Sequence, residues 1–185
     1  MNIHCAFLLA ALALPGAAAA SAWDLQPGST LEFTGSMQGE GFEGRFGAFD
    51  ADIVFDPADL AGARFDVAID LASADTDNSE RDETLLGPEF FDVADTPQAH
   101  YVATRFRSDG DGFLADGELT LHGVTRPVPL HFTFERTVDG AVLAGHAELD
   151  RLQFGIGSGE WADPETIAHA VQVETRLELR PATSK

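Results

Sequence analysis

The side chains that could carry chemistry are scattered along this chain rather than grouped. Ser158 stands between two glycines but lacks the Gly-x-Ser-x-Gly spacing of a hydrolase nucleophile. No two histidines after residue 22 have the close spacing of a zinc motif. These histidines are His100, His122, His131, His146 and His169. We therefore assign no catalytic residue and no zinc site, and we expect a protein that is not an enzyme.

The acidic string from Asp75 to Glu80 begins like a calcium-binding loop. An EF-hand loop requires Gly at its sixth position and a bidentate Glu at its twelfth. Glu80 and Leu86 occupy those two positions here. The string does not fit the motif, and we predict no resident metal and no cofactor.

The charge of the chain excludes several classes of partner. The 185 residues include 31 Asp and Glu against 11 Lys and Arg, which gives a formal net charge of −20. Such a surface repels nucleic acid and anionic lipid headgroups, but it does not oppose a neutral ligand buried inside. The only cysteine is Cys5. Beyond the first residues, the chain therefore has no disulfide and no thiol nucleophile.

Residues 1–22 have the pattern of a secretory signal peptide. Residues 3–14 are apolar except for His4, Pro15 and Gly16 interrupt the run, and Ala20-Ser21-Ala22 offers a small-x-small cleavage site. The run is too short to span a bilayer, which needs ~20 apolar residues. With no second such segment, we expect a soluble periplasmic protein whose single domain covers residues 23–185.

The dominant pattern in that domain is alternation with a period of two, which is typical of strands with one dry and one wet face. It is clearest in residues 63–71, 127–135 and 171–179, and weaker runs cover 29–37, 45–55, 98–107, 112–121 and 140–150. Turn signals such as Asp109-Gly110 and His122-Gly123 separate them. About eight antiparallel strands are predicted, and they must close into a barrel or a sandwich to hide their edges.

Two segments break the alternation. Residues 78–86 read as a short helix that is capped near Asp77 or Asn78 and stopped by Gly87-Pro88. Residues 162–169 read as a helical turn with Pro164 near its start.

Four blocks of sequence occur in a distinctive order. Gly-Arg-Phe-Gly-Ala-Phe covers 44–49, and Ser-Ala-Asp-Thr at 73–76 leads to Arg81-Asp82 and Phe90-Phe91. Gly-Glu-Leu-Thr-Leu-His-Gly-Val-Thr-Arg-Pro-Val covers 117–128, and Phe-Gly-Ile-Gly at 154–157 precedes Trp161. Over about residues 23–179, this order and spacing resemble the YceI-like family of polyisoprenoid-binding proteins.

The resemblance implies an all-β fold, namely an eight-stranded antiparallel lipocalin-like barrel with one or two short helices. It also implies an exported bacterial protein that holds a polyprenyl chain, a quinone tail or a related isoprenoid lipid, and it is compatible with a homodimer. One position departs from the family pattern: Thr84 stands where the family often has His. Headgroup preference here is therefore expected to differ if that His contacts a ligand.

The apolar faces supply candidates for lining the barrel. An eight-stranded barrel is just wide enough to be filled by side chains or to hold one small ligand. Each buried CH₂ contributes ~0.8 kcal/mol, so a long apolar chain can bind without a polar anchor. The predicted lining residues are Phe33, Phe46, Phe55, Phe65, Val67, Ile69, Phe90, Phe91, Phe106, Leu119, Leu121, Phe132, Phe134, Phe154 and Trp161.

Arg81 and Asp82 have two interpretations. They either orient a lipid headgroup at the mouth of the barrel or form part of a helix surface with its caps. Adjacent helical residues do not face each other, so each is expected to bond to another residue rather than to its neighbour. Two other functions also fit the sequence: an interaction module whose barrel is packed solid, and an enzyme acting on a small apolar substrate with His or Asp at the barrel mouth.

Overall fold

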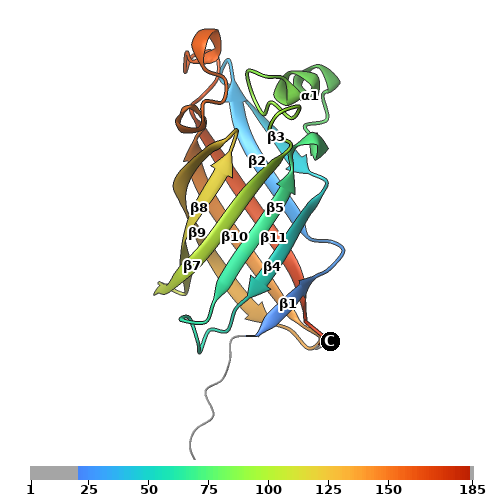
Figure 1. Cartoon of the computed structure of the whole chain (residues 1–185), viewed down its shortest axis with the longest axis vertical. Helices are drawn as coiled ribbons and strands as arrows, with labels where there is room; N and C mark the ends of the chain where they lie inside the picture. Colours follow the sequence, from blue (N-terminus) through green and yellow to red (C-terminus); the bar gives the residue numbers. More distant parts are fainter. Residues whose placement is uncertain (1–20, 184–185) are drawn as a thin grey trace, which may run out of the picture.

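The computed structural model describes residues 21–183. It is an elongated barrel, with a short helix α1 (Ser79–Leu86) at one end and the C-terminus at the other (Figure 1). Among the described residues, no helix is long and apolar enough to cross a membrane. The predicted signal peptide lies almost entirely outside this range.

All strand pairs are antiparallel, and the sheet closes on itself because β1 pairs with both β4 and β11. β1 and β2 follow one another along a single path in the wall, and so do β3 and β4. If each path is counted once and the two-residue β6 is set aside, the wall has the eight strands that were predicted. The strands are β1 (Ala22–Leu25), β2 (Thr30–Met37), β3 (Glu40–Phe46), β4 (Phe49–Val54), β5 (Arg64–Asp70), β6 (Ala74–Asp75), β7 (Gln98–Asp109), β8 (Gly112–Leu121), β9 (Val124–Arg136), β10 (Ala141–Asp150) and β11 (Ala170–Pro181).

The predicted strand 45–55 is wrong as a single element. β3 begins earlier, at Glu40, and the path breaks at Gly47-Ala48, where both backbone N–H groups leave the ladder. The Gly47 N–H donates to the Ser73 carbonyl, and the Ala48 N–H donates to Ser73 Oγ. The break lets β3 pair with β2 while β4 pairs with β5. A four-residue strand, β1, was not predicted.

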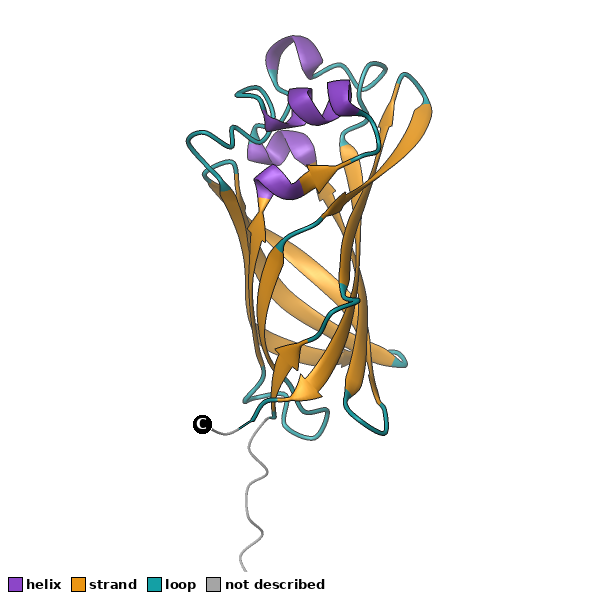
Figure 2. Cartoon of the chain, turned by 90° about the vertical axis from the view of Figure 1, so that its right-hand side faces the viewer, coloured by secondary structure: helices purple, strands orange, loops and turns teal. Residues whose placement is uncertain are grey.

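The helical pieces gather at one end of the barrel (Figure 2). α1 starts where predicted, because Asn78 Oδ1 accepts the Arg81 N–H at 3.1 Å as an N-cap. A helical turn was predicted within residues 162–169, and here the Asp163 carbonyl accepts from the N–H groups of Thr166 and Ile167, three and four residues further on. The 3₁₀ turns are Leu71–Ser73, Arg151–Phe154 and Gly159–Trp161.

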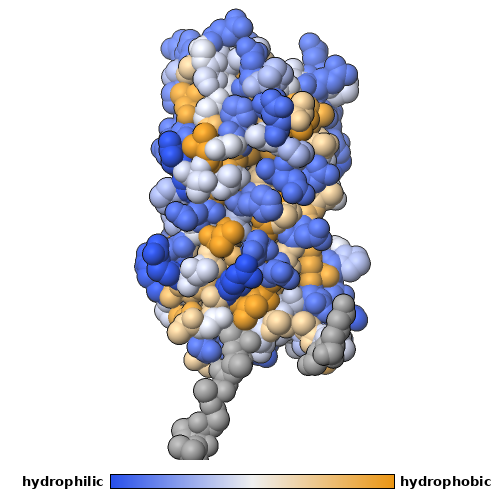
Figure 3. Space-filling model, in the orientation of Figure 1, coloured by the Kyte–Doolittle hydropathy of each residue, from blue (hydrophilic) through white to orange (hydrophobic). Residues whose placement is uncertain are grey.

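The alternation predicted for β5, β9 and β11 is correct, and their apolar residues form the interior. The outer face seen in Figure 3 is mostly hydrophilic, with scattered apolar residues. The buried residues divide into two clusters along the barrel axis, one beneath α1 and one near the chain termini. This division separates the part of the barrel that is hollow from the part that is filled.

Candidate functional site

A cavity of about 450 Å³ occupies the barrel beneath α1. That volume lies in the usual range of small-molecule sites. The neighbouring strands β10, β11, β2 and β3 supply one continuous part of the wall, and β8 supplies Leu119 and Leu121. α1 and its N-cap border the mouth with Asn78, Glu80, Arg81 and Thr84. Below the mouth the lining is almost entirely apolar: Phe33, Phe42, Phe46, Leu71, Leu85, Phe90, Phe91, Leu119, Leu121, Leu149, Ile156, Trp161, Ile167, Val171 and Val173.

A second cavity of about 100 Å³ lies deeper in the barrel, lined by residues such as Phe65, Val67 and Leu143. Leu119, Leu149 and Val173 border both cavities. The hollow part of the barrel therefore extends as a tube from the α1 end toward the middle.

Packed aromatic rings fill the end of the barrel near the termini. Phe55 is fully buried, and its ring centroid lies 5.0 Å from Phe113, 5.1 Å from Phe132 and 5.0 Å from Phe134. Phe106 packs edge-on against Phe65 at 4.7 Å. These distances are typical of favourable aromatic pairs, so this end is a solid core.

The predicted lining residues divide between these three places. Those that border the larger cavity are Phe33, Phe46, Phe90, Phe91, Leu119, Leu121 and Trp161. Phe65 and Val67 border the smaller cavity. Phe55, Phe106, Phe132 and Phe134 belong to the packed aromatic end or lie against it. Ile69 and Phe154 are buried in the cluster around the larger cavity but border neither cavity.

Glycines in the wall let aromatic rings lie flat against it. Phe33 lies opposite Gly44 in the β2–β3 ladder, and Phe42 lies opposite Gly35. A Cβ at Gly35 would come within 2.6 Å of Phe42 Cζ, and one at Gly44 would overlap the Phe33 ring. Each ring thus occupies the space of a missing side chain, which keeps the lumen of the barrel open.

Tyr101 repeats this arrangement deeper in the barrel, where its ring covers Gly117. Burial raises the pKa of the Tyr101 hydroxyl above its usual value. Within residues 21–183 this buried hydroxyl has no hydrogen-bond partner. Tyr101 borders the smaller cavity, and its hydroxyl is neutral there rather than an acid or a base at neutral pH.

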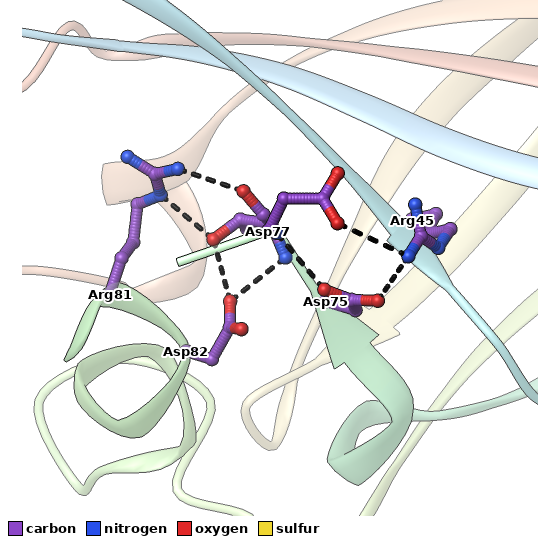
Figure 4. Close-up of polar contacts among 6 residues, drawn as sticks. Arg45, Asp75, Asp77, Arg81 and Asp82 are labelled. Carbon is purple, nitrogen blue, oxygen red and sulfur yellow. Dashed lines mark hydrogen bonds and ion pairs between the residues drawn. The ribbon is translucent and has the colours of Figure 1, made fainter. Parts of the chain in front are cut away.

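Thr76 holds Arg81 and Asp82 in place at the mouth (Figure 4). Thr76 Oγ1 donates to Asp82 Oδ1 at 2.6 Å, and the Thr76 N–H donates to the same oxygen at 2.9 Å. Arg81 donates from Nε to Thr76 Oγ1 and from Nη2 to the Thr76 carbonyl, both at 2.9 Å. The guanidinium also lies 4.5 Å from the centroid of the Phe42 ring. Arg81 and Asp82 thus share one partner and do not pair with each other.

Arg81 borders the cavity, whereas Asp82 does not. Asp82 orders the Thr76 segment, as the structural interpretation expected, and Arg81 combines that role with a place at the mouth. The acidic string from Asp75 to Glu80, which begins like a calcium-binding loop, binds an arginine: Arg45 pairs with Asp75 and Asp77. A hydrogen bond from the Asp77 backbone N–H holds the pKa of Asp75 below its usual value, and the nearby Arg45 acts in the same direction.

The sequence analysis did not single out Arg151, yet this residue holds together the segment 155–168, which borders the cavity. It is buried, and its guanidinium donates to the backbone carbonyls of five residues: Ile156, Gly157, Trp161, Ile167 and Ala168. The bonds range from 2.6 to 3.0 Å and use all five N–H groups of the side chain. Burial lowers the pKa of Arg151. The segment 155–168, which has no regular strand, is thereby tied to the end of β10.

Among residues 21–183, no three His, Cys, Asp or Glu side chains gather closely enough to hold a metal ion. His131 and His146 stack on the outer wall, and His131 Nδ1 lies 2.8 Å from Asp109. Neither histidine borders a cavity.

The model of the YceI-like domain matches residues 23–179, which is nearly the whole of the described chain. The chain belongs to the YceI-like family. The YceI-like barrel of Burkholderia cenocepacia BcnA is similar to it in three dimensions, with a TM-score of 0.81 and 28% identity over 86% of this chain and 100% of the other. A polyisoprenoid-binding domain from Saccharophagus degradans has the same fold, with a TM-score of 0.67 and 17% identity over 89% and 100% of the two chains.

Curated relatives of this chain carry the name UPF0312 protein. One from Vibrio parahaemolyticus is 30% identical over 148 residues, which cover 74% of this chain and 78% of the relative. One from Yersinia pestis is 42% identical over 87 residues, covering 47% of this chain and 45% of the relative. The match therefore spans less than half the length of the Yersinia relatives.

Proposed function

We propose that this protein is an exported periplasmic carrier that holds a long apolar isoprenoid, such as a polyprenyl chain or a quinone tail, inside its barrel. The observation that supports this most is the cavity of about 450 Å³, whose walls below the mouth are almost entirely apolar. A domain with the same fold is named for polyisoprenoid binding. The N-terminal pattern of a signal peptide supports the location.

The hydrophobic effect supplies the affinity. A fifteen-carbon stretch buried at ~0.8 kcal/mol per CH₂ gains a gross ~12 kcal/mol before the costs of ordering and association. Aromatic rings held flat by Gly35 and Gly44 give a smooth wall for such a chain. A long, narrow ligand fits the tube better than a compact one, since the second cavity continues the first.

The alternatives account for less of the structure. A barrel packed solid for protein interaction does not explain why only the end near the termini is filled. An enzyme would need reactive groups at the cavity, but Arg151 is fully engaged by carbonyls and Asp82 is occupied by Thr76. The other polar side chains that border the larger cavity, Asn78, Glu80, Arg81 and Thr84, lie at the mouth.

The position of the tryptophans provides a test. Trp161 borders the cavity, whereas Trp23 lies at the packed end beside Phe134. Titration with a quinone that carries a short isoprenoid tail should quench tryptophan fluorescence with a stoichiometry of one. In the Trp161→Phe variant, the quenching should largely disappear while binding measured by calorimetry persists. Wild-type protein that shows neither quenching nor heat of binding would refute the proposed function.

A further inference from the structure

Few charged side chains border the cavity, and the two arginines among them have defined hydrogen-bond partners. They are Glu80, Arg81 and Arg151. Arg151 has no N–H left for a ligand, because five carbonyl bonds use them all. Arg81 is the remaining cation, and its Nε and Nη2 are bonded to Thr76.

One terminal nitrogen of Arg81 is free to meet a ligand. Figure 4 draws no hydrogen bond or ion pair from this nitrogen, Nη1, and within residues 21–183 no hydrogen bond from it is present. The two Thr76 bonds and the Phe42 ring fix the orientation of the guanidinium. With the second N–H of Nη2, three N–H groups of this guanidinium remain for acceptor atoms of a ligand.

The surroundings of Arg81 are acidic. Residues 75–89 carry six carboxylates, and Arg81 is their only Lys or Arg. Glu80 borders the cavity next to Arg81, and Glu89 stands nearby, where it accepts the Trp161 Nε1–H at 2.9 Å. Arg45 lies close but is already paired with Asp75 and Asp77. A ligand that placed several negative charges here would face repulsion that the one positive charge of Arg81 does not offset.

We infer that the mouth selects isoprenoids with a neutral polar end, carrying a single acceptor oxygen such as a quinone carbonyl, a phenol or an alcohol, and rejects the corresponding diphosphates. Arg81 donates to that oxygen, and Glu80 is the residue that discriminates against the anion. This preference deepens the proposed function and rests on it, because it concerns the headgroup of the lipid inside the same cavity.

Competition between farnesol and farnesyl diphosphate tests the preference, because the two share one fifteen-carbon chain. Each competitor is added to delipidated protein loaded with the short-tail quinone, in low salt with EDTA, and the recovery of Trp161 fluorescence is followed. Farnesol should displace the quinone at a concentration at least about tenfold lower than farnesyl diphosphate does. Equal or stronger displacement by the diphosphate would overturn the inference. An absence of quinone quenching in the first place would instead overturn the proposed function.

A matched pair of charge reversals locates the effect. Glu80→Lys and Glu83→Lys make the same change on the same exposed helix, but only Glu80 borders the cavity. Glu80→Lys should improve displacement by farnesyl diphosphate about tenfold, and Glu83→Lys should improve it by less than about threefold. Glu83→Lys should not alter displacement by farnesol. Equal improvement in both variants would mean that overall charge, and not the mouth, sets the preference, which would contradict the assignment to Glu80.

Discussion

Thr76 shows how much one small side chain organises at the mouth of the barrel. It is buried, yet its hydroxyl, amide and carbonyl groups all bond to charged residues of α1. The order of residues 73–82 suggested a turn followed by a helix, but the sequence has no signal for a shared hydrogen-bond partner. Such a partner depends on the exact path of the chain between β6 and α1.

The hydroxyl of Thr76 can be removed with little change of shape. Thr76→Val leaves Arg81 Nε without its acceptor and removes one donor to Asp82, so the free energy of unfolding should fall by about 1–3 kcal/mol. Thr76→Ser keeps the hydroxyl and should restore most of the loss. Urea unfolding of the two variants measures the difference, and equal stability would show that the hydroxyl bonds contribute nothing.

Arg151 is the second residue whose role depends on the tertiary structure alone. Nothing in its sequence neighbourhood indicates that a charged residue at the end of β10 would be buried. Its five donors match five carbonyls of a segment that lacks strand partners, and backbone groups buried without partners are costly. The charge is therefore held by dipoles rather than by a carboxylate.

Arg151→Lys tests this role, because an ammonium group has three donors and cannot reach five carbonyls. The free energy of unfolding should fall by at least about 2 kcal/mol, and hydrogen exchange over residues 155–168 should accelerate. Arg126→Lys is the control, since Arg126 is exposed and donates only to the neighbouring Thr125 carbonyl. Unchanged exchange in the Arg151→Lys variant would rule out the tie between this segment and β10.

At the scale of elements, the β2–β3 hairpin forms part of the barrel wall and also determines the shape of the lumen. Each strand contributes a Phe that lies over the glycine of its neighbour, so Phe33 with Gly44 and Phe42 with Gly35 form a reciprocal pair. The sequence indicated glycines beside aromatic residues, but it did not place Phe42 in a strand. The reason is that residues 38–44 are rich in Gly and Glu and lack a clear period of two.

Adding one methyl group to this hairpin should narrow the lumen. A Cβ in Gly44→Ala would overlap the Phe33 ring and push it toward the cavity, at a cost of about 1–3 kcal/mol in stability. Quinone uptake should fall by at least about tenfold. Gly41→Ala is the matched control on the same strand, since its Cβ would meet only the Gly35 carbonyl oxygen, at 4.0 Å. Similar uptake by both variants would mean that the flat ring does not shape the site.

The sequence predicted which residues face inward, but it could not predict how far along the barrel each one lies. A period of two assigns Phe132 and Leu119 equally to the interior. The position along the axis depends on strand register and tilt, which set Phe132 opposite Phe113 and Gly145, and Leu119 opposite Tyr101 and Arg126. For this reason the predicted lining divides between a cavity and a packed core.

At the scale of the whole molecule, the two ends of the barrel differ in how they are packed. The aromatic end supplies tertiary stability, and the end beneath α1 is hollow. The strand count and closure follow from the alternating pattern and the family resemblance. The filling of one end does not, since it depends on which rings meet across the barrel.

Truncation of the central ring should separate stability from binding. Phe55→Ala removes a fully buried side chain, so the free energy of unfolding should fall by about 3–5 kcal/mol. Quinone affinity of the folded variant should stay within about threefold of wild type, because Phe55 borders neither cavity. Calorimetric titration below the unfolding transition measures this. Loss of binding by folded Phe55→Ala protein would show that the functional cavity extends into the aromatic end.

Native mass spectrometry of the protein purified from a bacterial periplasm, followed by organic extraction of the bound lipid, tests the central claim most directly. We predict a mature chain that begins near Trp23 and carries one stoichiometric adduct with the mass of a neutral isoprenoid, such as a quinone or a polyprenyl alcohol. The Gly44→Ala protein from the same preparation should carry much less of it. A clean mass without adduct, and without uptake of added isoprenoid, would contradict the carrier function.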